Sequence, residues 1–209
     1  MKRIILRMHM QPTVFLGPSL PLDEAREILD ANYQPPLRAG DLERMNTGTS
    51  VGVIDGILDP HCRLPIEEAR QALSRGVRVF GAASTGALLA VELEGEGVVG
   101  VGRVFAFLQD YVGDREDLIK IVYHDHDNIS LTIPLIGAAL ALGDLSPKQT
   151  RTLIKDLSGL PLCKRTASAI ESRMRSATEQ ERWNAVPIAA MFDVKADDAR
   201  QLLRHLSNL

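Results

Sequence analysis

Apolar residues along the chain fall into short runs that alternate with helical patterns. Each run is stopped by glycine, proline or aspartate, as short buried strands are. The runs cover residues 13–17, 50–54 and 77–81. Apolar side chains at helical spacing follow each run and predict helices over residues 22–29, 65–74 and 86–93. Strands and helices in this alternation predict a parallel-type sheet with covering helices.

The pattern changes along the rest of the chain. Residues 101–112 fit a helix, and residues 118–127 fit a further strand. Two segments predict irregular loops: residues 33–42, which contain Pro35 and Pro36, and residues 94–100, which contain several glycines. From Ser146 on, every apolar pattern is helical, over residues 146–157, 165–184, 187–192 and 196–206. We therefore predict an α/β domain over residues 12–145, followed by an all-helical C-terminal segment over residues 146–209.

The end of that helical segment carries a narrow apolar stripe formed by Leu202, Leu203 and Leu206. Such a stripe needs a partner, which is either the α/β domain of the same chain or a second chain. Arg200 and Arg204 flank the stripe and would suit the rim of an interface. Both alternatives stay open from the sequence, and a subunit or partner interface is one prediction for this segment.

Composition excludes several classes of function. The 209 residues carry a formal net charge of −3 with mixed signs and only 4% aromatic residues, so the chain lacks the basic and stacking surfaces of nucleic-acid-binding proteins. The first apolar residues are interrupted by Arg7 and His9, which argues against a membrane span. Two cysteines without metal-ligand spacing favour a reduced, cytoplasmic compartment. The glycines of "GEGVVGVG" follow a helix and not a strand, so they are not a dinucleotide-binding motif. No cofactor is expected.

Candidate chemistry lies directly after the predicted strands. Ligands of open α/β sheets bind beyond the carboxyl ends of the strands. Gly17 and Ser19 follow the first strand, Asp55 and Gly56 the second, and Ser84 the third. If these strands are neighbours, Ser19, Asp55 and Ser84 border one crevice.

The turn "GAASTG" after the third strand resembles a nucleophile elbow, Gly-x-Ser-x-Gly, with alanine at the first glycine. An elbow exposes its serine, here Ser84, beside helix N–H groups that hold a developing anion. Ala83, Thr85 and Gly86 would complete such an anion site, and their small size would admit a thin ligand. The alternative is that Ser84 or Thr85 only caps the following helix.

Other candidates have simpler alternatives. His124 and His126 would share one face of a strand and could serve as a general base or as metal ligands, but two histidines do not complete a metal site, so none is predicted. Cys62 follows His61, although adjacent residues seldom face each other, so we favour an unreactive thiol. Glu92 lies on an apolar helix, where it is either a solvent-facing residue or a buried one with a partner.

Several blocks of the chain resemble the TfuA-like family in the right order. They are "VFLGPSL" at residues 14–20, "YQPPLRAGDL" at 33–42, "VIDG" at 53–56, "ALSRGVRVFGAASTGALLAVEL" at 72–93 and "GVGRVF" at 100–105. The resemblance covers about residues 13–140. Two places depart from the family pattern: Ile66 and Glu67 stand where His-Lys is common, and Leu89 stands where an arginine is common.

The resemblance implies an accessory protein of YcaO-type enzymes, which replace a peptide amide oxygen by sulfur. It further implies sulfur delivery from a ubiquitin-like carrier whose C-terminal glycine holds a thiocarboxylate. In the enzymatic interpretation, Ser84 is the nucleophile or anion anchor, Asp55 orients it and His124 is the base. In the other interpretation, the crevice only binds the carrier or the partner enzyme. A second copy of the chain is a further expected partner.

Overall fold

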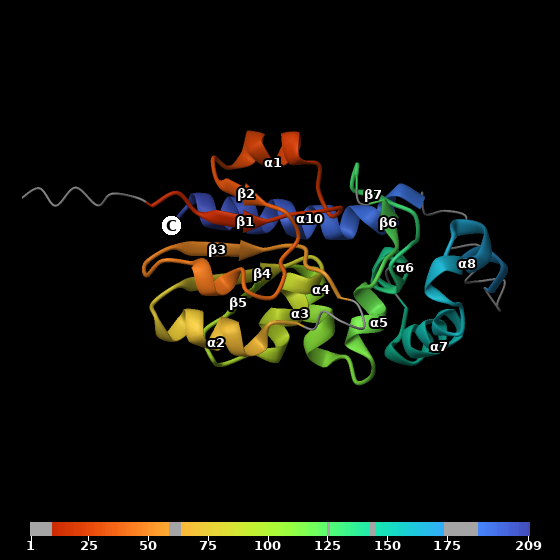
Figure 1. The fold of residues 1–209 in the computed structure, drawn as a ribbon. Coiled ribbons are helices and arrows are strands. Elements are labelled where there is room, and N and C mark those ends of the chain that lie inside the picture. Colours follow the sequence, from red (N-terminus) through yellow and green to blue (C-terminus); the bar gives the residue numbers. More distant parts are fainter. Residues whose placement is uncertain (1–9, 59–63, 125, 143–144, 174–187) are drawn as a thin grey trace, which may run out of the picture.

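The fold is built on one parallel sheet, as predicted. The computed structural model describes residues 10–58, 64–124, 126–142, 145–173 and 188–209. Its main strands are β1 (Thr13–Phe15), β2 (Asn32–Gln34), β3 (Ser50–Val53), β4 (Arg78–Ala82) and β5 (Val99–Val101). They lie in the order β2-β1-β3-β4-β5, and every neighbouring pair is parallel (Figure 1). The strand order reverses between β1 and β3, and ligands of such sheets bind at this kind of switch point.

Helices cover both faces of the sheet. The helices α2 (Ile66–Ser74) and α3 (Thr85–Glu92) pack on one face, over the side chains of Phe15, Val51 and Val79. The opposite face carries α1 (Leu22–Ile28) and α10 (Ile188–Ser207), over Val14 and Phe80 (Figure 1). Because both faces are covered, the central strands are apolar on both sides, and this explains why they read as continuous apolar runs.

The C-terminal helix α10 packs back on the sheet. Leu202, Leu203 and Leu206 are at most 5% exposed and lie in one cluster with Val14 of β1. Gly52 of β3 leaves room for the helix, since a Cβ there would press on Leu206. The apolar stripe thus finds its partner within the chain. Residues 188–207 also form one helix, where the sequence predicted separate patterns over residues 187–192 and 196–206.

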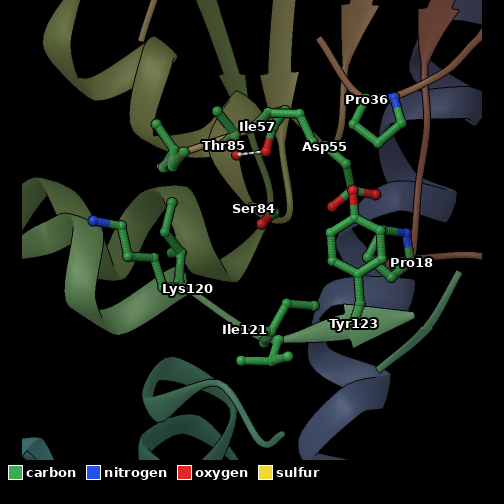
Figure 2. A pocket seen from close by; sticks show the side chains of 13 residues that line it. Pro18, Pro36, Asp55, Ile57, Ser84, Thr85, Lys120, Ile121 and Tyr123 are labelled. Atoms are coloured by element: carbon green, nitrogen blue, oxygen red, sulfur yellow. Dashed lines mark hydrogen bonds between the residues drawn. The ribbon is translucent and has the colours of Figure 1, made fainter. Parts of the chain in front are cut away.

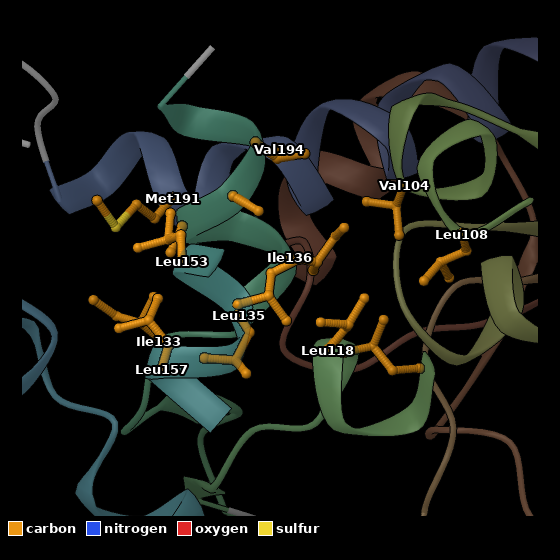
Figure 3. Packing of buried hydrophobic residues seen from close by; sticks show 14 of the residues in the cluster. Val104, Leu108, Leu118, Ile133, Leu135, Ile136, Leu153, Leu157, Met191 and Val194 are labelled. Carbon is orange, nitrogen blue, oxygen red and sulfur yellow. The ribbon is translucent and has the colours of Figure 1, made fainter. Parts of the chain in front are cut away.

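The remaining helices, together with the start of α10, form a third apolar cluster (Figure 3). Its members include Val104, Leu118, Ile136, Leu153 and Met191. They come from α4 (Arg103–Asp110), α5 (Arg115–Ile119), α6 (Leu135–Ala141), α7 (Pro147–Ser158) and α10, and Ile170 of α8 (Ala167–Arg173) joins them. Two 3-10 turns, η1 (Leu42–Arg44) and η2 (Leu162–Lys164), complete the helical elements described. The division into residues 12–145 and 146–209 stays a prediction, and this cluster joins residues from both.

Three sequence predictions of secondary structure were wrong. The segments expected as loops overlap with β2 and β5, which are edge strands of only three residues each and therefore have little pattern to detect. Gly100 of β5 lies under the Phe105 ring, which leaves no room for a side chain. Residues 118–127 are not one strand, because α5 extends to Ile119. A hairpin of β6 (Tyr123–His124) and β7 (Ile129–Ser130) follows it.

Replacing Leu202 by alanine tests how much the fold depends on α10. The side chain is fully buried between the helix and the sheet, so we expect Leu202→Ala to lower the free energy of unfolding by about 2–5 kcal/mol. Urea unfolding followed by circular dichroism measures the loss. Gln201→Ala is the control, because Gln201 is an exposed neighbour on the same helix. An unchanged midpoint for Leu202→Ala would show that α10 does not stabilise the sheet.

Candidate active site

Asp55 joins the ends of β1 and β3 at the switch point. Its Oδ2 accepts hydrogen bonds from the backbone N–H groups of Gly17 (2.9 Å) and Ser19 (3.1 Å), and its Oδ1 accepts one from the Ser19 hydroxyl (2.7 Å). Asp55 is 4% exposed and Ser19 is 8% exposed. A buried carboxylate with three donors is well satisfied. Asp55 therefore fixes the loop after β1 against the end of β3.

The turn after β4 has the strained backbone of an elbow. Ala83 has a positive φ of 65°, which is uncommon for a residue with a Cβ. The N–H of Ser84 donates to the Ala82 carbonyl across it at 2.7 Å, which makes a three-residue turn. The chain then enters α3 at once. This sharp reversal presents Ser84 at the carboxyl end of the sheet.

Two glycines allow α3 to start this close to the strands. A Cβ at Gly81 would overlap the Gly86 carbonyl, and a Cβ at Gly86 would overlap the Val53 carbonyl. The Gly86 N–H donates to the Ile54 carbonyl, and the Thr85 hydroxyl donates to the Gly56 carbonyl. The absence of side chains at these two glycines thus permits close packing of α3 on the sheet inside the protein. Ala83, Thr85 and Gly86 are all buried there.

The side chain that contacts Ser84 is Lys195 of α10. Its Nζ donates to the Ser84 Oγ at 3.0 Å and to the Ile119 carbonyl at 2.8 Å. Ser84 occupies the N-cap position of α3, but its side chain makes no capping hydrogen bond. The simpler reading of Ser84 as a helix cap therefore does not account for its hydroxyl. A serine hydroxyl paired with a lysine amine is a known form of activated nucleophile.

Burial gives Lys195 an unusual acidity. The residue is 3% exposed, and this burial lowers the pKa of its ammonium group from 10.5 to about 8, although the negative charge of Asp55 raises it in part. With that pKa, about a tenth of the molecules carry a neutral amine at pH 7. Lys195 can therefore exchange a proton with Ser84 at ordinary pH.

A cavity of about 370 Å³ opens in front of Ser84 and Asp55 (Figure 2). Asp55 and Thr85 line it from the strand side, and Lys120, Ile121 and Tyr123 line it from the opposite side. Lys195 does not line this cavity and meets Ser84 from the protein interior. Most of the wall is apolar. The cavity suits a small or thin group whose reacting atom lies at Ser84.

Buried polar contacts hold Lys195 in place from two sides. Asp198, one turn further along α10, accepts hydrogen bonds from the N–H groups of Arg103 and Val104 at the start of α4. Gly102 makes room for it, since a Cβ there would overlap the Asp198 carboxylate. On the other side, the guanidinium of Arg165 binds the carboxylate of Asp117 in α5 at 2.6 Å. The same helix ends at Ile119, whose carbonyl accepts the hydrogen bond from Lys195.

The other sequence candidates lie elsewhere. His124 does not line the cavity, its side chain is 60% exposed, and its Nδ1 pairs with Asp127 at 2.9 Å. Glu92 is 44% exposed and pairs with Arg115, so it is the solvent-facing residue of the two alternatives. His61 and Cys62 lie outside the described residues. Within the described ranges, no three His, Cys, Asp or Glu side chains gather into a group able to hold a metal ion.

Sequence reasoning missed Lys195, although the helix carried a signal. Met191, Lys195, Asp198 and Leu202 follow one another at intervals of three and four, so two charged residues interrupt an otherwise apolar stripe. Charged residues are seldom fully buried without a partner. Such an interruption points to a specific polar contact on the buried face, but nothing in the sequence identifies the partner.

Comparison with protein-family models matches residues 55–166 to the family described as TfuA-like protein. This segment is more than half of the 209 residues. The chain belongs to the TfuA-like family. A comparison with curated proteins found no match. The matched segment contains Asp55, Ser84 and Ile119, whereas Ser19 and Lys195 lie outside it. In the described parts of this TfuA-like protein, no helix is long and apolar enough to cross a membrane.

Replacing Lys195 by methionine separates its chemistry from its structural contribution. Because the unfolded chain binds the Lys195 proton more tightly, the charged ammonium destabilises the folded protein by roughly 3 kcal/mol at neutral pH. We therefore expect Lys195→Met to melt at the same temperature as the wild type or higher. Labelling of Ser84 by a fluorophosphonate should slow by about 100-fold if the Lys195 amine is the group that takes the serine proton.

Lys120→Met is the matched control for this experiment. Lys120 lines the same cavity, but its ammonium pairs with Glu116 at 2.9 Å and its side chain is 31% exposed. This variant should label at the wild-type rate. A large fall in melting temperature for Lys195→Met, with labelling preserved, would mean that Lys195 is a structural residue.

Proposed function

We infer that membership of the TfuA-like family gives this protein an accessory role in YcaO-dependent thioamidation. We propose that it supplies the sulfur by releasing sulfide from a thiocarboxylated ubiquitin-like carrier, with Ser84 as nucleophile and Lys195 as general base. The contact of 3.0 Å between the Ser84 Oγ and the Lys195 Nζ, in a buried site beside a cavity, carries this proposal.

In the first step, the neutral amine of Lys195 takes the proton of the Ser84 hydroxyl while Oγ attacks the carrier's terminal carbonyl carbon. The oxygen anion that develops lies beside the start of α3, where the positive end of the helix dipole stabilises it. The C–S bond then breaks, and sulfur takes the proton from Lys195 and leaves as hydrosulfide. The carrier remains bound to Ser84 as an ester.

In the second step, water attacks the ester carbonyl and Lys195 accepts a proton from it. The bond to Ser84 breaks, Oγ recovers a proton, and the carrier leaves with an ordinary carboxylate. The sum is one thiocarboxylate plus one water giving one carboxylate plus one sulfide. Asp55 has no direct part in these transfers. It orients the loop after β1 and keeps a negative charge near Lys195.

In this proposal, Lys195 replaces His124 as the general base. His124 has its own partner in Asp127 and does not line the cavity, so Lys195 takes that part. The departures from the family pattern at Ile66, Glu67 and Leu89 do not touch the Ser84–Lys195 contact. Leu89 is fully buried in the α2–α3 face of the sheet, and Glu67 is an exposed partner of Arg70.

Ser84→Ala tests the chemistry against a binding-only role. We expect the variant to fold and melt like the wild type, while sulfide release from a thiocarboxylated carrier falls by about 100-fold or more because the nucleophile is lost. Mass spectrometry of the carrier and trapping of sulfide measure this. Ser74→Ala is the control, since that hydroxyl bonds only to its own helix. If Ser84→Ala releases sulfide normally, or still supports the YcaO enzyme in full, the protein acts as a scaffold for carrier or partner.

The pH dependence of sulfide release tests Lys195. Its amine must be neutral to accept the serine proton, and its pKa is lowered to about 8 by burial. The single-turnover rate should rise about tenfold per pH unit below that value and level off above it. Rates measured between about pH 6 and 10, at fixed ionic strength, give the profile. A flat profile over this range would exclude Lys195 as the general base.

A further inference from the structure

A second cavity of about 760 Å³ adjoins the first. The two cavities share Pro18, in the loop after β1, and Pro36, which packs on Gly17. From these prolines the second cavity extends along the β2 edge of the sheet, past Tyr33 and Gln34, to Arg38. The two spaces thus meet at Pro18 and Pro36, and we infer that they form one groove that narrows at these two prolines.

The β6–β7 hairpin spans both cavities from the opposite side. Tyr123 at its start lines the first cavity, and Asp127, Asn128 and Ile129 at its tip line the second. Ile129 is 57% exposed, and Leu22, across the cavity on α1, is 41% exposed. Large apolar side chains that stay this exposed on both sides of a groove favour an occupant with apolar groups of its own.

The spacing of the strands sets the length of that occupant. The groove runs across the carboxyl ends of β2, β1, β3 and β4, and neighbouring strands are about 4.8 Å apart. Three such intervals are roughly 14 Å, which an extended polypeptide covers with about four residues. If the C-terminal carbonyl of an extended chain lies at Ser84, the residue about four positions before the C-terminus therefore lies in the second cavity.

We propose that the second cavity binds the side chains about four or five residues before the reacting C-terminal carbonyl of an extended polypeptide. The proposal rests on the function proposed above, since the polypeptide is the tail of the carrier. The first cavity accepts the last two residues, and the narrowing at Pro18 and Pro36 requires small residues there. Leu22 and Ile129 contact an apolar side chain in the second cavity. Arg38, which is exposed at its rim, faces the backbone carbonyls or an acidic residue of the tail.

Binding of short peptides tests this without any turnover. The probes are two peptides of about eight residues that end in Gly-Gly and differ at roughly the fourth position from the end, where one has leucine and the other serine. Fluorescence polarisation of the labelled peptides with the full-length protein gives both affinities. We expect the leucine peptide to bind about tenfold more tightly, because the groove removes its side chain from water.

Ile129→Asp should abolish this preference, since a carboxylate in the groove opposes an apolar side chain. Leu131→Asp is the matched control. Leu131 is two residues further along the hairpin segment and is 56% exposed, but it does not line the cavity. It should keep the tenfold preference. Equal affinities of the two peptides for the wild type, or equal loss in both variants, would overturn the proposal.

Kinetics with thiocarboxylated peptides separate this proposal from the proposed function. Ile129→Asp should lower kcat/KM for the longer leucine peptide by about tenfold through KM, while Gly-Gly thiocarboxylate, which fills only the first cavity, is hydrolysed at the wild-type rate. Hydrolysis of both substrates without a length or leucine preference would refute the groove and leave the sulfide-release function standing. Preferential binding of the leucine peptide without any hydrolysis would refute the chemistry and leave the groove standing.

Discussion

The contact between α10 and the sheet is the interaction on which the rest of the structure depends. The helices that connect β3 to β4 and β4 to β5 both lie on one face, so the opposite face of these strands needs a separate cover. The helix α10 provides it, with Leu202, Leu203 and Leu206 buried against β1, β3 and β4. The same docking places Asp198 at the start of α4 and Lys195 behind Ser84. Stability and candidate chemistry therefore share one helix.

Close backbone packing has a comparable effect around Ser84. Gly81 and Gly86 let α3 begin almost in contact with β3 and β4, and the chain accepts a positive φ at Ala83 to make the turn. This arrangement brings the helix N-terminus, the serine hydroxyl and the end of β3 into a small space. Strain at Ala83 and a buried ammonium at Lys195 are both unfavourable in themselves. Their concentration beside one cavity is typical of a functional site.

The central sheet could be predicted from the sequence because its strands are buried on both faces and read as continuous apolar runs. The edge strands β2 and β5 could not, since three residues with polar or glycine members carry no periodicity. The rule that sites lie after parallel strands brought out Ser19, Asp55 and Ser84. The structure places Asp55 and Ser84 on one cavity, whereas Ser19 does not line it and is joined to it only through its hydrogen bonds to Asp55. His124 looked equally suitable as a base in the sequence, but a short hairpin turns it toward Asp127.

Lys195 marks the limit of that reasoning. It is separated from Ser84 by 111 positions in the chain, and only the docking of α10 brings the two together. A local motif cannot contain such a pair. What the sequence does contain is a lysine and an aspartate on the apolar face of the helix, which indicate buried polar contacts without naming their partners.

That separation also sets the order in which the site comes into being during protein synthesis. The ribosome releases Ser84 and the whole sheet well before it releases residues 188–207. Until then Ser84 has no lysine beside it, and one face of the sheet is open. On the proposed mechanism, the nascent chain therefore holds a serine without its base until the final helix closes over the sheet. A chain with misplaced C-terminal packing would lack the Lys195 contact at Ser84 as well as the cover of the sheet.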